Sequence, residues 1–238
     1  MKKVIYIAEL DADIDDVVAA EYLHRKGILQ EVVCDPVPTS KDGLHRKKEL
    51  EKIGVKVSDE IPTNAKYVFV GGALTKLAKY VKTNKIEYLV MNGGFVGNNI
   101  VPLDKQLKKF KRKDVVRTFN FNCDVNATHS VLKSSNIKNI VLIGKNVCHS
   151  EKNTLKGVWE SERSLLEKYN VKESKLQHDM LACREGLIIL NLLNEEPYLS
   201  YKKVKPMNDG LKGNMTLWGS TLAGSPYRPV LAAVDWID

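Results

Sequence analysis

Four carboxylates lie within six residues near the start of the chain: Asp11, Asp13, Asp15 and Asp16. Two unit charges about 4 Å apart repel by ~1 kcal/mol in water, and by several times that value in a partly buried site. A bound cation would remove this repulsion. The spacing of these aspartates therefore predicts a metal-binding site.

Two simpler structures also use aspartates at such a spacing. Asp15 or Asp16 could cap a helix while the others face water, and this alternative stays open, although a cap needs only one carboxylate. A calcium loop of the EF-hand type opens with D-x-D-x-D, but here its glycine position is Asp16 and its closing glutamate position is Tyr22. An EF-hand is therefore excluded.

The elements around the aspartates would place them where ligands bind. Residues 2–8 are mostly β-branched and aromatic, which predicts a buried strand, and residues 15–27 have the pattern of a helix. The cluster then lies on a strand-to-helix turn, at the carboxyl end of a strand. Open α/β sheets bind ligands at this end, and the start of a helix favours negative charge.

Strands and helices alternate along most of the chain. Further strands, some ending in a glycine turn, are predicted at 28–35, 66–72, 86–94, 115–121 and 136–143, and further helices at 44–54, 73–82, 123–135, 156–170 and 179–194. The tail from residue 201 has the pattern of strands and turns. The order predicts an α/β fold in three layers, a mainly parallel sheet flanked by helices, in one domain covering 1–238.

Composition excludes some classes of protein. The 238 residues are 43% hydrophobic, which is enough for an ordinary core, and no apolar run has the length of a membrane span. The four cysteines have no CxxC pairing and no secretory segment is apparent, so we expect reduced cysteines, a cytoplasmic location and no membrane partner. The net charge of +8 indicates either an anionic ligand or a generally lysine-rich proteome.

A basic insertion is predicted at about 103–117. Six of the nine residues from 105 to 113 are Lys or Arg. Such runs are usually solvated surface, and this interpretation stays open beside a phosphate-binding one. The candidate phosphate ligands are Lys108, Lys109, Lys111 and Arg112.

Five short motifs, in order, resemble those of the calcium-dependent inosine-uridine nucleoside hydrolases. The segment ELDADIDD (9–16) is similar to the family's D-x-D-P-G-x-D-D, with Glu9 at the position of the first aspartate. The others are GALTKLA (72–78), MNGGFVGNNIVP (91–102), TFNFNCDVNATHS (118–130) and HDMLACR (178–184). Together they cover nearly the whole chain, so the resemblance implies this family's fold, with a Ca²⁺ cofactor.

The resemblance also implies roles for individual residues. The calcium ligands would be Asp11, Asp16, Asp179 and the backbone carbonyl of Thr75. Asp11 would take a proton from the attacking water, and His178 would protonate the leaving base. The sugar would bind Asp15, Asn120 and either Asn98 or Asn99, of which the spacing to Pro102 favours Asn99.

Departures from the family pattern concern the sugar. Cys34, Asp35 and Pro36 replace a glycine-asparagine pair that contacts ribose, and the following segment is much shortened, which would remove a flap. Thr118 replaces a glutamate that contacts the 5′-hydroxyl, directly after the basic insertion. A carboxylate would repel a 5′-phosphate, whereas Lys or Arg would pair with it, so the loss of the acid and the gain of bases favour a phosphate at this end of the sugar. The ligand expected near Thr118 is therefore a nucleotide or a nucleic-acid end rather than a free nucleoside.

The sequence thus predicts an enzyme that hydrolyses the N-glycosidic bond of a nucleoside or 5′-nucleotide. A protein that binds the same ligand without cleaving it is the alternative, and a glycosylase acting on nucleic acid is a less favoured third. Homo-oligomers are common in the family, but no segment identifies an interface. The base and the kind of sugar stay open.

Overall fold

The computed structural model describes residues 2–10, 14–35, 43–98, 100–206, 216–220 and 227–237. Asp11, Asp13 and Asn99 lie outside the described residues. The roles assigned to Asp11 and Asn99 therefore stay predictions. Among the described residues, no helix has the length and apolar character needed to cross a membrane.

The described strands form one ten-stranded sheet in the order β3-β2-β1-β4-β5-β7-β10-β8-β9-β6. Neighbours from β3 to β10 are parallel, and β8, β9 and β6 add an antiparallel edge. The strands are β1 (Val4–Ala8), β2 (Leu29–Cys34), β3 (Val57–Ser58), β4 (Tyr67–Val70), β5 (Ile86–Asn92), β6 (Val115–Val116), β7 (Ile137–Ile143), β8 (Leu199–Pro206), β9 (Thr216–Ser220) and β10 (Val230–Trp236). The predicted mainly parallel sheet is confirmed.

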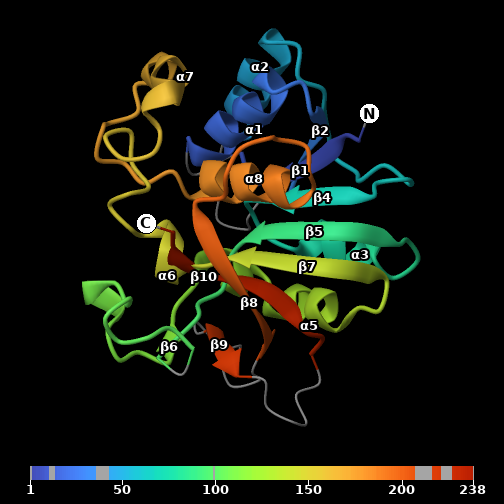
Figure 1. The fold of residues 1–238 in the computed structure, drawn as a ribbon. Coiled ribbons are helices and arrows are strands. Elements are labelled where there is room, and N and C mark those ends of the chain that lie inside the picture. The colour runs from blue at the N-terminus through green and yellow to red at the C-terminus, as the bar shows by residue number, and fades with distance from the viewer. Residues whose placement is uncertain are drawn as a thin grey trace.

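Helices cover both faces of this sheet (Figure 1). They are α1 (Asp15–Arg25), α2 (Gly43–Lys52), α3 (Thr75–Tyr80), α4 (Phe119–Cys123), α5 (Val125–Lys133), α6 (Lys145–Cys148), α7 (Arg163–Lys168) and α8 (His178–Ile189). Helices α1 and α8 contribute to one hydrophobic core, and α3 and α5 to a second core on the other face. The three predicted layers are therefore confirmed.

The two cores follow from the alternation of side chains along each strand. In β1, Val4 and Tyr6 pack into the core below α1 and α8, whereas Ile5 and Ile7 pack into the opposite core. All five residues of β1 are buried. Burial on both faces explains why parallel strands of this kind are apolar throughout rather than alternating.

Four neighbouring parallel strands bring chemically useful residues to one edge. Glu9 follows β1, Gly71 follows β4, Asn92 ends β5, and Lys145 comes two residues after β7. Because these strands lie side by side in the order β1-β4-β5-β7, their carboxyl ends meet. The first turns of α1 and α8 then add carboxylates at the same edge.

Two predicted elements are shorter than expected. The strand predicted at 115–121 ends at Val116, and Phe119 already begins α4. Here Asn122 donates its side-chain amide to the Thr118 carbonyl at 2.6 Å, which closes a helical turn. The helix predicted at 156–170 begins only at Glu160, as a 3-10 turn that leads into α7, because Gly157 is in a tight turn against the Lys152 backbone.

The basic insertion lies on the surface. Lys108–Phe110 form a single 3-10 turn, and Lys108, Lys109, Lys111 and Arg112 are all exposed. This agrees with a solvated segment. Whether these bases could bind a phosphate depends on which of them contact the candidate site.

Candidate functional site

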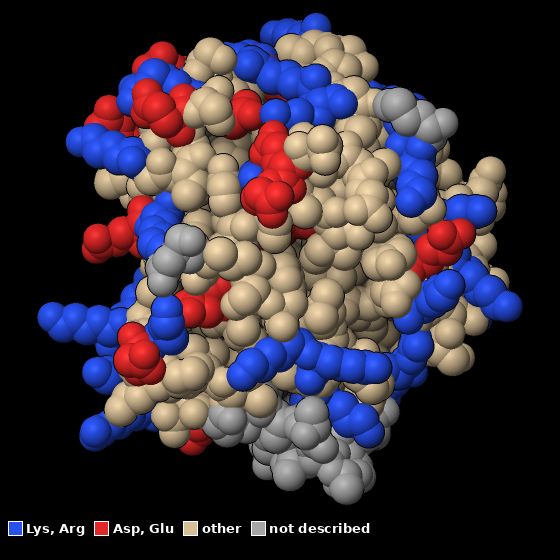
Figure 2. All heavy atoms as spheres, viewed as in Figure 1, with Lys and Arg blue, Asp and Glu red and all other residues tan. Residues whose placement is uncertain are grey.

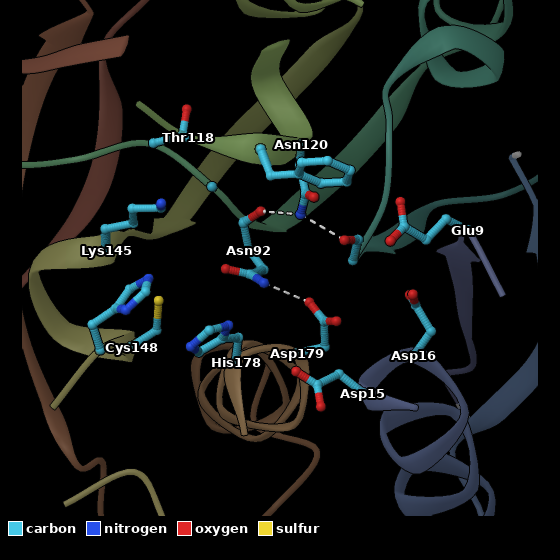
Figure 3. A pocket seen from close by; sticks show the side chains of 14 residues that line it. Glu9, Asp15, Asp16, Asn92, Thr118, Asn120, Lys145, Cys148, His178 and Asp179 are labelled. Carbon is cyan, nitrogen blue, oxygen red and sulfur yellow. Dashed lines mark hydrogen bonds between the residues drawn. The ribbon is translucent and has the colours of Figure 1, made fainter. Parts of the chain in front are cut away.

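A cavity of about 350 Å³ opens at the carboxyl edge of the sheet. This volume lies in the usual range for small-molecule sites, ~300–1,000 Å³. Figure 3 shows carboxylates on one side of it and Lys145 and Cys148 on the opposite side. The lining residues are Glu9, Asp15, Asp16, Gly71, Asn92, Gly93, Thr118, Phe119, Asn120, Lys145, Cys148, His149, His178 and Asp179.

The acidic wall of the cavity consists of Glu9, Asp15, Asp16 and Asp179. Asp15 and Asp16 form the first turn of α1, and they are only 6% and 2% exposed. The residue at the N-cap position of α1 is Ile14, and no side chain caps the helix there. The alternative of a solvated aspartate cap is therefore excluded for these two residues.

Each aspartate of this turn has a defined partner. The Tyr6 hydroxyl donates a hydrogen bond to Asp16 Oδ1 at 3.1 Å. Lys175 Nζ lies 3.1 Å from Asp15 Oδ1 and forms an ion pair with it. Asp16 is thus buried against a neutral donor, while Asp15 already has a cationic partner at the edge of the cavity.

Asp179 reaches the same place from the first turn of α8. Burial raises its pKa well above the ordinary carboxyl value, and the nearby Asp16 and Asp15 raise it further. Asn92 Nδ2 donates to Asp179 Oδ1 at 2.6 Å, which opposes this rise. The negative charge of Asp179 is therefore poorly compensated by the described side chains.

Gly71 shows how closely Asp16 and Asp179 approach. A Cβ atom added at Gly71 would lie 2.8 Å from Asp16 Oδ1 and 3.0 Å from Asp179 Cγ. Real Cβ atoms essentially never have neighbours closer than 3.0 Å. A side chain here would collide first with the Tyr6 hydroxyl and then with Asp16, so glycine is required directly after β4, where the two carboxylates approach.

Two asparagines lie between the walls (Figure 3). Asn120 donates its side-chain amide to the Gly71 carbonyl at 2.5 Å and to the Asn92 carbonyl at 2.8 Å. These bonds tie α4 to the ends of β4 and β5. Because the amide hydrogens are used, Asn120 presents its side-chain oxygen as an acceptor for a ligand hydroxyl.

The acidic wall fits a hard divalent cation. Asp16 and Asp179 offer only oxygen ligands and are buried, and burial together with the neighbouring Asp16 raises the pKa of Asp179. Within the described residues the wall does not bring three carboxylate oxygens within 4.8 Å of one another. The predicted ligand set also includes Asp11, which lies outside those residues.

A second trio of candidate metal ligands fits less well. The ligand atoms of Cys148, His149 and His178 lie within 4.8 Å of one another. Burial raises the pKa of the Cys148 thiol to about 12, so the thiolate that binds metals is disfavoured. Lys109 Nζ lies 2.8 Å from His149 Nδ1 and occupies that nitrogen. The positive charges around this trio favour an anion over a cation.

The basic wall consists of Lys145, Cys148 and His149, all from the turn after β7. Burial lowers the pKa of His149 to about 3, with further contributions from His178, Lys109 and Lys145. His149 is therefore neutral near pH 7. Its ring lies beside that of His178, with centroids 4.7 Å apart.

The structure places most of the predicted site residues in this cavity, but not all. Asp15, Asp16, Thr118, Asn120, His178 and Asp179 line it. Thr75 is not among the lining residues, and its hydroxyl donates to Asp124 Oδ2 at 3.0 Å. Asn98 is exposed, accepts a hydrogen bond from Gln106 Nε2 at 3.3 Å, and lies outside the lining.

The predicted phosphate ligands divide into two groups. Lys108 and Lys109 line a neighbouring cavity of about 1130 Å³, which shares His149 with the first. Lys111 and Arg112 line neither cavity. Of the four bases, Lys109 is the one that contacts a residue of the first cavity.

Several residues that line the site were missed from sequence, among them Asn92, Lys145 and His149. Asn92 belongs to the quoted motif MNGGFVGNNIVP, and its place at the end of a predicted strand could have indicated it. Lys145 and His149 follow another predicted strand in the same way. Their residue types are common on surfaces, so the topology of the sheet is the signal that singles them out.

Comparison with known proteins reveals the fold. The chain is similar to the inosine-uridine preferring nucleoside hydrolase from Bacillus anthracis, with a TM-score of 0.61 and 16% identity over 100% of this chain and 95% of that one. It is also similar to an inosine-guanosine nucleoside hydrolase, with a TM-score of 0.53 and 13% identity over 98% and 94%. No family model and no curated protein sequence matches. The chain has the nucleoside hydrolase fold.

Proposed function

We propose that this protein hydrolyses the N-glycosidic bond of a nucleoside or nucleoside 5′-phosphate and releases the free base and the sugar. The observation that carries the proposal is the approach of buried Asp16 and Asp179 across Gly71, in a cavity at the carboxyl edge of a sheet with the nucleoside hydrolase fold. Two buried carboxylates whose charges repel are costly to a protein unless they bind something.

The proposed cofactor is calcium, held by Asp11, Asp16 and Asp179; the Thr75 carbonyl, which the resemblance implied as a fourth ligand, belongs to a residue outside the cavity lining. These are all oxygen donors, and calcium takes ~6–8 of them, which leaves room for water and sugar hydroxyls. When bound, calcium would neutralise the carboxylates and lower the pKa of a water molecule beside them. The burial of Asp16 and Asp179 supports this ligand set.

The proposed reaction is a displacement at the sugar. A water oxygen bonds to C1′, the C1′–N bond breaks, and its electron pair leaves on the base. Asp11 accepts a proton from the water, and His178 donates one to the departing nitrogen. The net change consumes one water, and solvent returns the proton from Asp11 to His178.

The remaining residues bind and stabilise. Asp15 and the side-chain oxygen of Asn120 would accept hydrogen bonds from sugar hydroxyls. The carboxylates of the acidic wall would also stabilise the positive charge that develops on the sugar ring, as in other glycoside hydrolysis. Phe119 lines the cavity and is 50% exposed, so it could pack against a ring of the ligand.

Release of free base from nucleosides and their 5′-monophosphates tests the proposal, with calcium and with a chelator. We expect release that requires calcium and that Asp11→Asn abolishes. As a matched control, Asp104→Asn changes an exposed aspartate that lines neither cavity and should keep full activity.

Two other results would point elsewhere. Binding of a nucleoside by calorimetry without any cleavage would identify a binding protein on the same fold. Cleavage of bases only from a nucleic acid, with binding that weakens steeply as salt rises, would identify the nucleic-acid glycosylase.

A further inference from the structure

Lys145 is a cation in the cavity wall that lacks an acidic partner. It lines the cavity and is half-buried. Across the described ranges, no carboxylate forms an ion pair with Lys145. Burial lowers its pKa, and the nearby Lys109 and Arg117 lower it further. Two exposed positive charges thus lie near this half-buried cation.

The backbone fixes Lys145 in this position. Its amide donates to the Gly94 carbonyl at 3.0 Å, which ties the turn after β7 to the turn after β5. The next residue, Asn146, is buried, donates to the Ala233 carbonyl at 2.8 Å, and accepts from the Val96 amide at 3.2 Å. These bonds hold the start of α6 against β10. The cation therefore projects from a rigid part of the sheet edge.

Lys109 and Arg117 come from the segment of the chain that faces this wall. Lys109 contacts His149, and Arg117 directly precedes Thr118, which lines the cavity and is 2% exposed. In the part of the chain that the structure describes, neither base has a carboxylate partner. Figure 2 shows Lys and Arg side chains projecting at the lower left, where Figure 1 places the chain around β6.

We propose that Lys145 binds the 5′-phosphate of a nucleoside monophosphate, with Lys109 and Arg117 completing the anion subsite. The proposal rests on the proposed function, and it narrows the substrate class from nucleosides in general to their 5′-phosphates. It leaves out Lys111 and Arg112, which do not line the cavity. Lys109 and Arg117 do not line it either, but Lys109 contacts His149 and Arg117 directly precedes Thr118, and both of those residues do line it. Thr118 is neutral at this end, where an acid would repel a phosphate.

The opposite charges of the two walls fix the direction of the substrate. Sugar hydroxyls that face the acidic wall leave the 5′ carbon to face Lys145. A phosphate on the 3′ oxygen would instead lie against Asp15, Asp16 and Asp179, where like charges repel. The cavity should therefore select the 5′-monophosphate over the 3′-monophosphate, although both carry the same charge.

The test compares kcat/KM for one base as nucleoside, 5′-monophosphate and 3′-monophosphate. We expect the wild type to prefer the 5′-monophosphate over the other two. Lys145→Met should lower the ratio of 5′-monophosphate to nucleoside by about 10- to 100-fold, because one charge-assisted hydrogen bond has about this effect. Lys145→Arg, which keeps the charge, should retain most of the preference.

Two further variants distinguish an effect of Lys145 from a general effect of removing a positive charge. Lys82→Met removes an exposed lysine that lines neither cavity and should leave the ratio unchanged. Lys111→Met should also have little effect. A wild type that prefers nucleosides, or a Lys111→Met variant that loses as much preference as Lys145→Met, would overturn the inference.

Binding distinguishes failure of this inference from failure of the proposed function. If no compound is cleaved, the proposed function fails, and calorimetry with 5′-monophosphate and with inorganic phosphate still tests the subsite. Binding of the monophosphate that Lys145→Met weakens at least about 10-fold, with Lys82→Met as wild type, would support the inference. Equal binding by all three proteins would refute it.

Discussion

The acidic and basic walls of one cavity are assembled in different ways. Three of the four acids come from residues 9–16, and Asp179 joins them from α8. The basic wall is built from a short turn after β7, with support from Lys109 and Arg117 far back in the chain. The carboxylates of the first wall are therefore mostly neighbours in sequence, whereas the bases around the second come from two separate segments of the chain.

This difference has an energetic counterpart. On the acidic wall, Asp16 and Asp179 are held together by burial and by Gly71 although their charges repel. On the basic wall, Lys145 is only half-buried and the other bases face solvent, where screening weakens repulsion. Without a bound cation, repulsion within the acidic wall should accordingly destabilise the protein more than repulsion within the basic wall does without a bound anion.

The largest effect is expected from Asp16→Asn, which removes one charge of the acidic wall and keeps the shape. Substitution of a residue that only hydrogen-bonds a metal ligand typically lowers metal affinity or activity by about 10–100-fold. Loss of a ligand itself should therefore lower calcium affinity and kcat/KM by more than about 100-fold. Calcium titration by calorimetry and base-release rates measure the two effects. Asp104→Asn is the control, and an active Asp16→Asn variant would remove Asp16 from the ligand set.

Calcium should next stabilise the folded protein. A ligand at 100 times its Kd adds about 2.7 kcal/mol, which for a chain of this size corresponds to a rise in Tm of roughly 5–10 °C. Asp179→Asn should show almost no calcium-dependent rise. A wild type whose Tm ignores calcium, measured by calorimetric scans with and without chelator, would argue against a cation at the acidic wall.

Asp179→Asn should also reveal the repulsion between Asp179 and Asp16 in the metal-free protein. The raised pKa of Asp179 means that its contribution to stability is present below the unfolded carboxyl value of about 3.9 and is lost as pH rises through the folded pKa. In the absence of metal, the free energy of unfolding of Asp179→Asn should therefore increase relative to that of the wild type as pH rises from about 4 to about 8. Urea unfolding at several pH values measures the difference, and a constant difference would contradict the assignment.

Asn92→Ala should have a smaller effect, because Asn92 acts through Asp179. Loss of the 2.6 Å hydrogen bond leaves Asp179 less well oriented and further raises its pKa. We expect calcium affinity to fall by about 10–100-fold, with a smaller change in Tm. Asn139→Ala is a matched control, since the Asn139 side-chain amide also donates one hydrogen bond, to the Glu87 backbone carbonyl, and Asn139 does not line the cavity. Equal calcium affinity in both variants would assign Asn92 no role at the metal.

The contrast between the walls also explains what the sequence could predict. The alternation of β-branched strands and helices, with glycine turns between them, predicted the three layers, because burial on both faces leaves a clear apolar run in β1 and β4. The acidic cluster was identified because like charges at such short spacing need an explanation. Asp16 and Asp179 meet as expected, although more than 160 residues separate them.

The rest depended on packing that spacing does not encode. The run of bases at 105–113 drew attention to Lys111 and Arg112, yet neither residue lines the cavity. Lys145 stands alone in sequence and becomes significant only because β7 lies next to β5 in the sheet. The strand predicted at 115–121 failed for a local reason, since the Asn122 side chain closes a helical turn that apolar pattern alone does not show.

The smallest expected effect concerns His149 and the basic wall. Its pKa of about 3 means that the neutral ring contributes fully to stability above the ordinary value of about 6.5, and that this contribution is lost as pH falls toward 3. For one proton the slope cannot exceed about 1.4 kcal/mol per pH unit, and partial exposure makes it smaller. Lys109→Met should raise the pKa of His149 slightly, because burial and His178 still act on it. NMR titration of the histidine ring protons measures this shift, and a His149 whose pKa is near the ordinary value of about 6.5 in the wild type would contradict the burial of its ring beside His178 and these lysines.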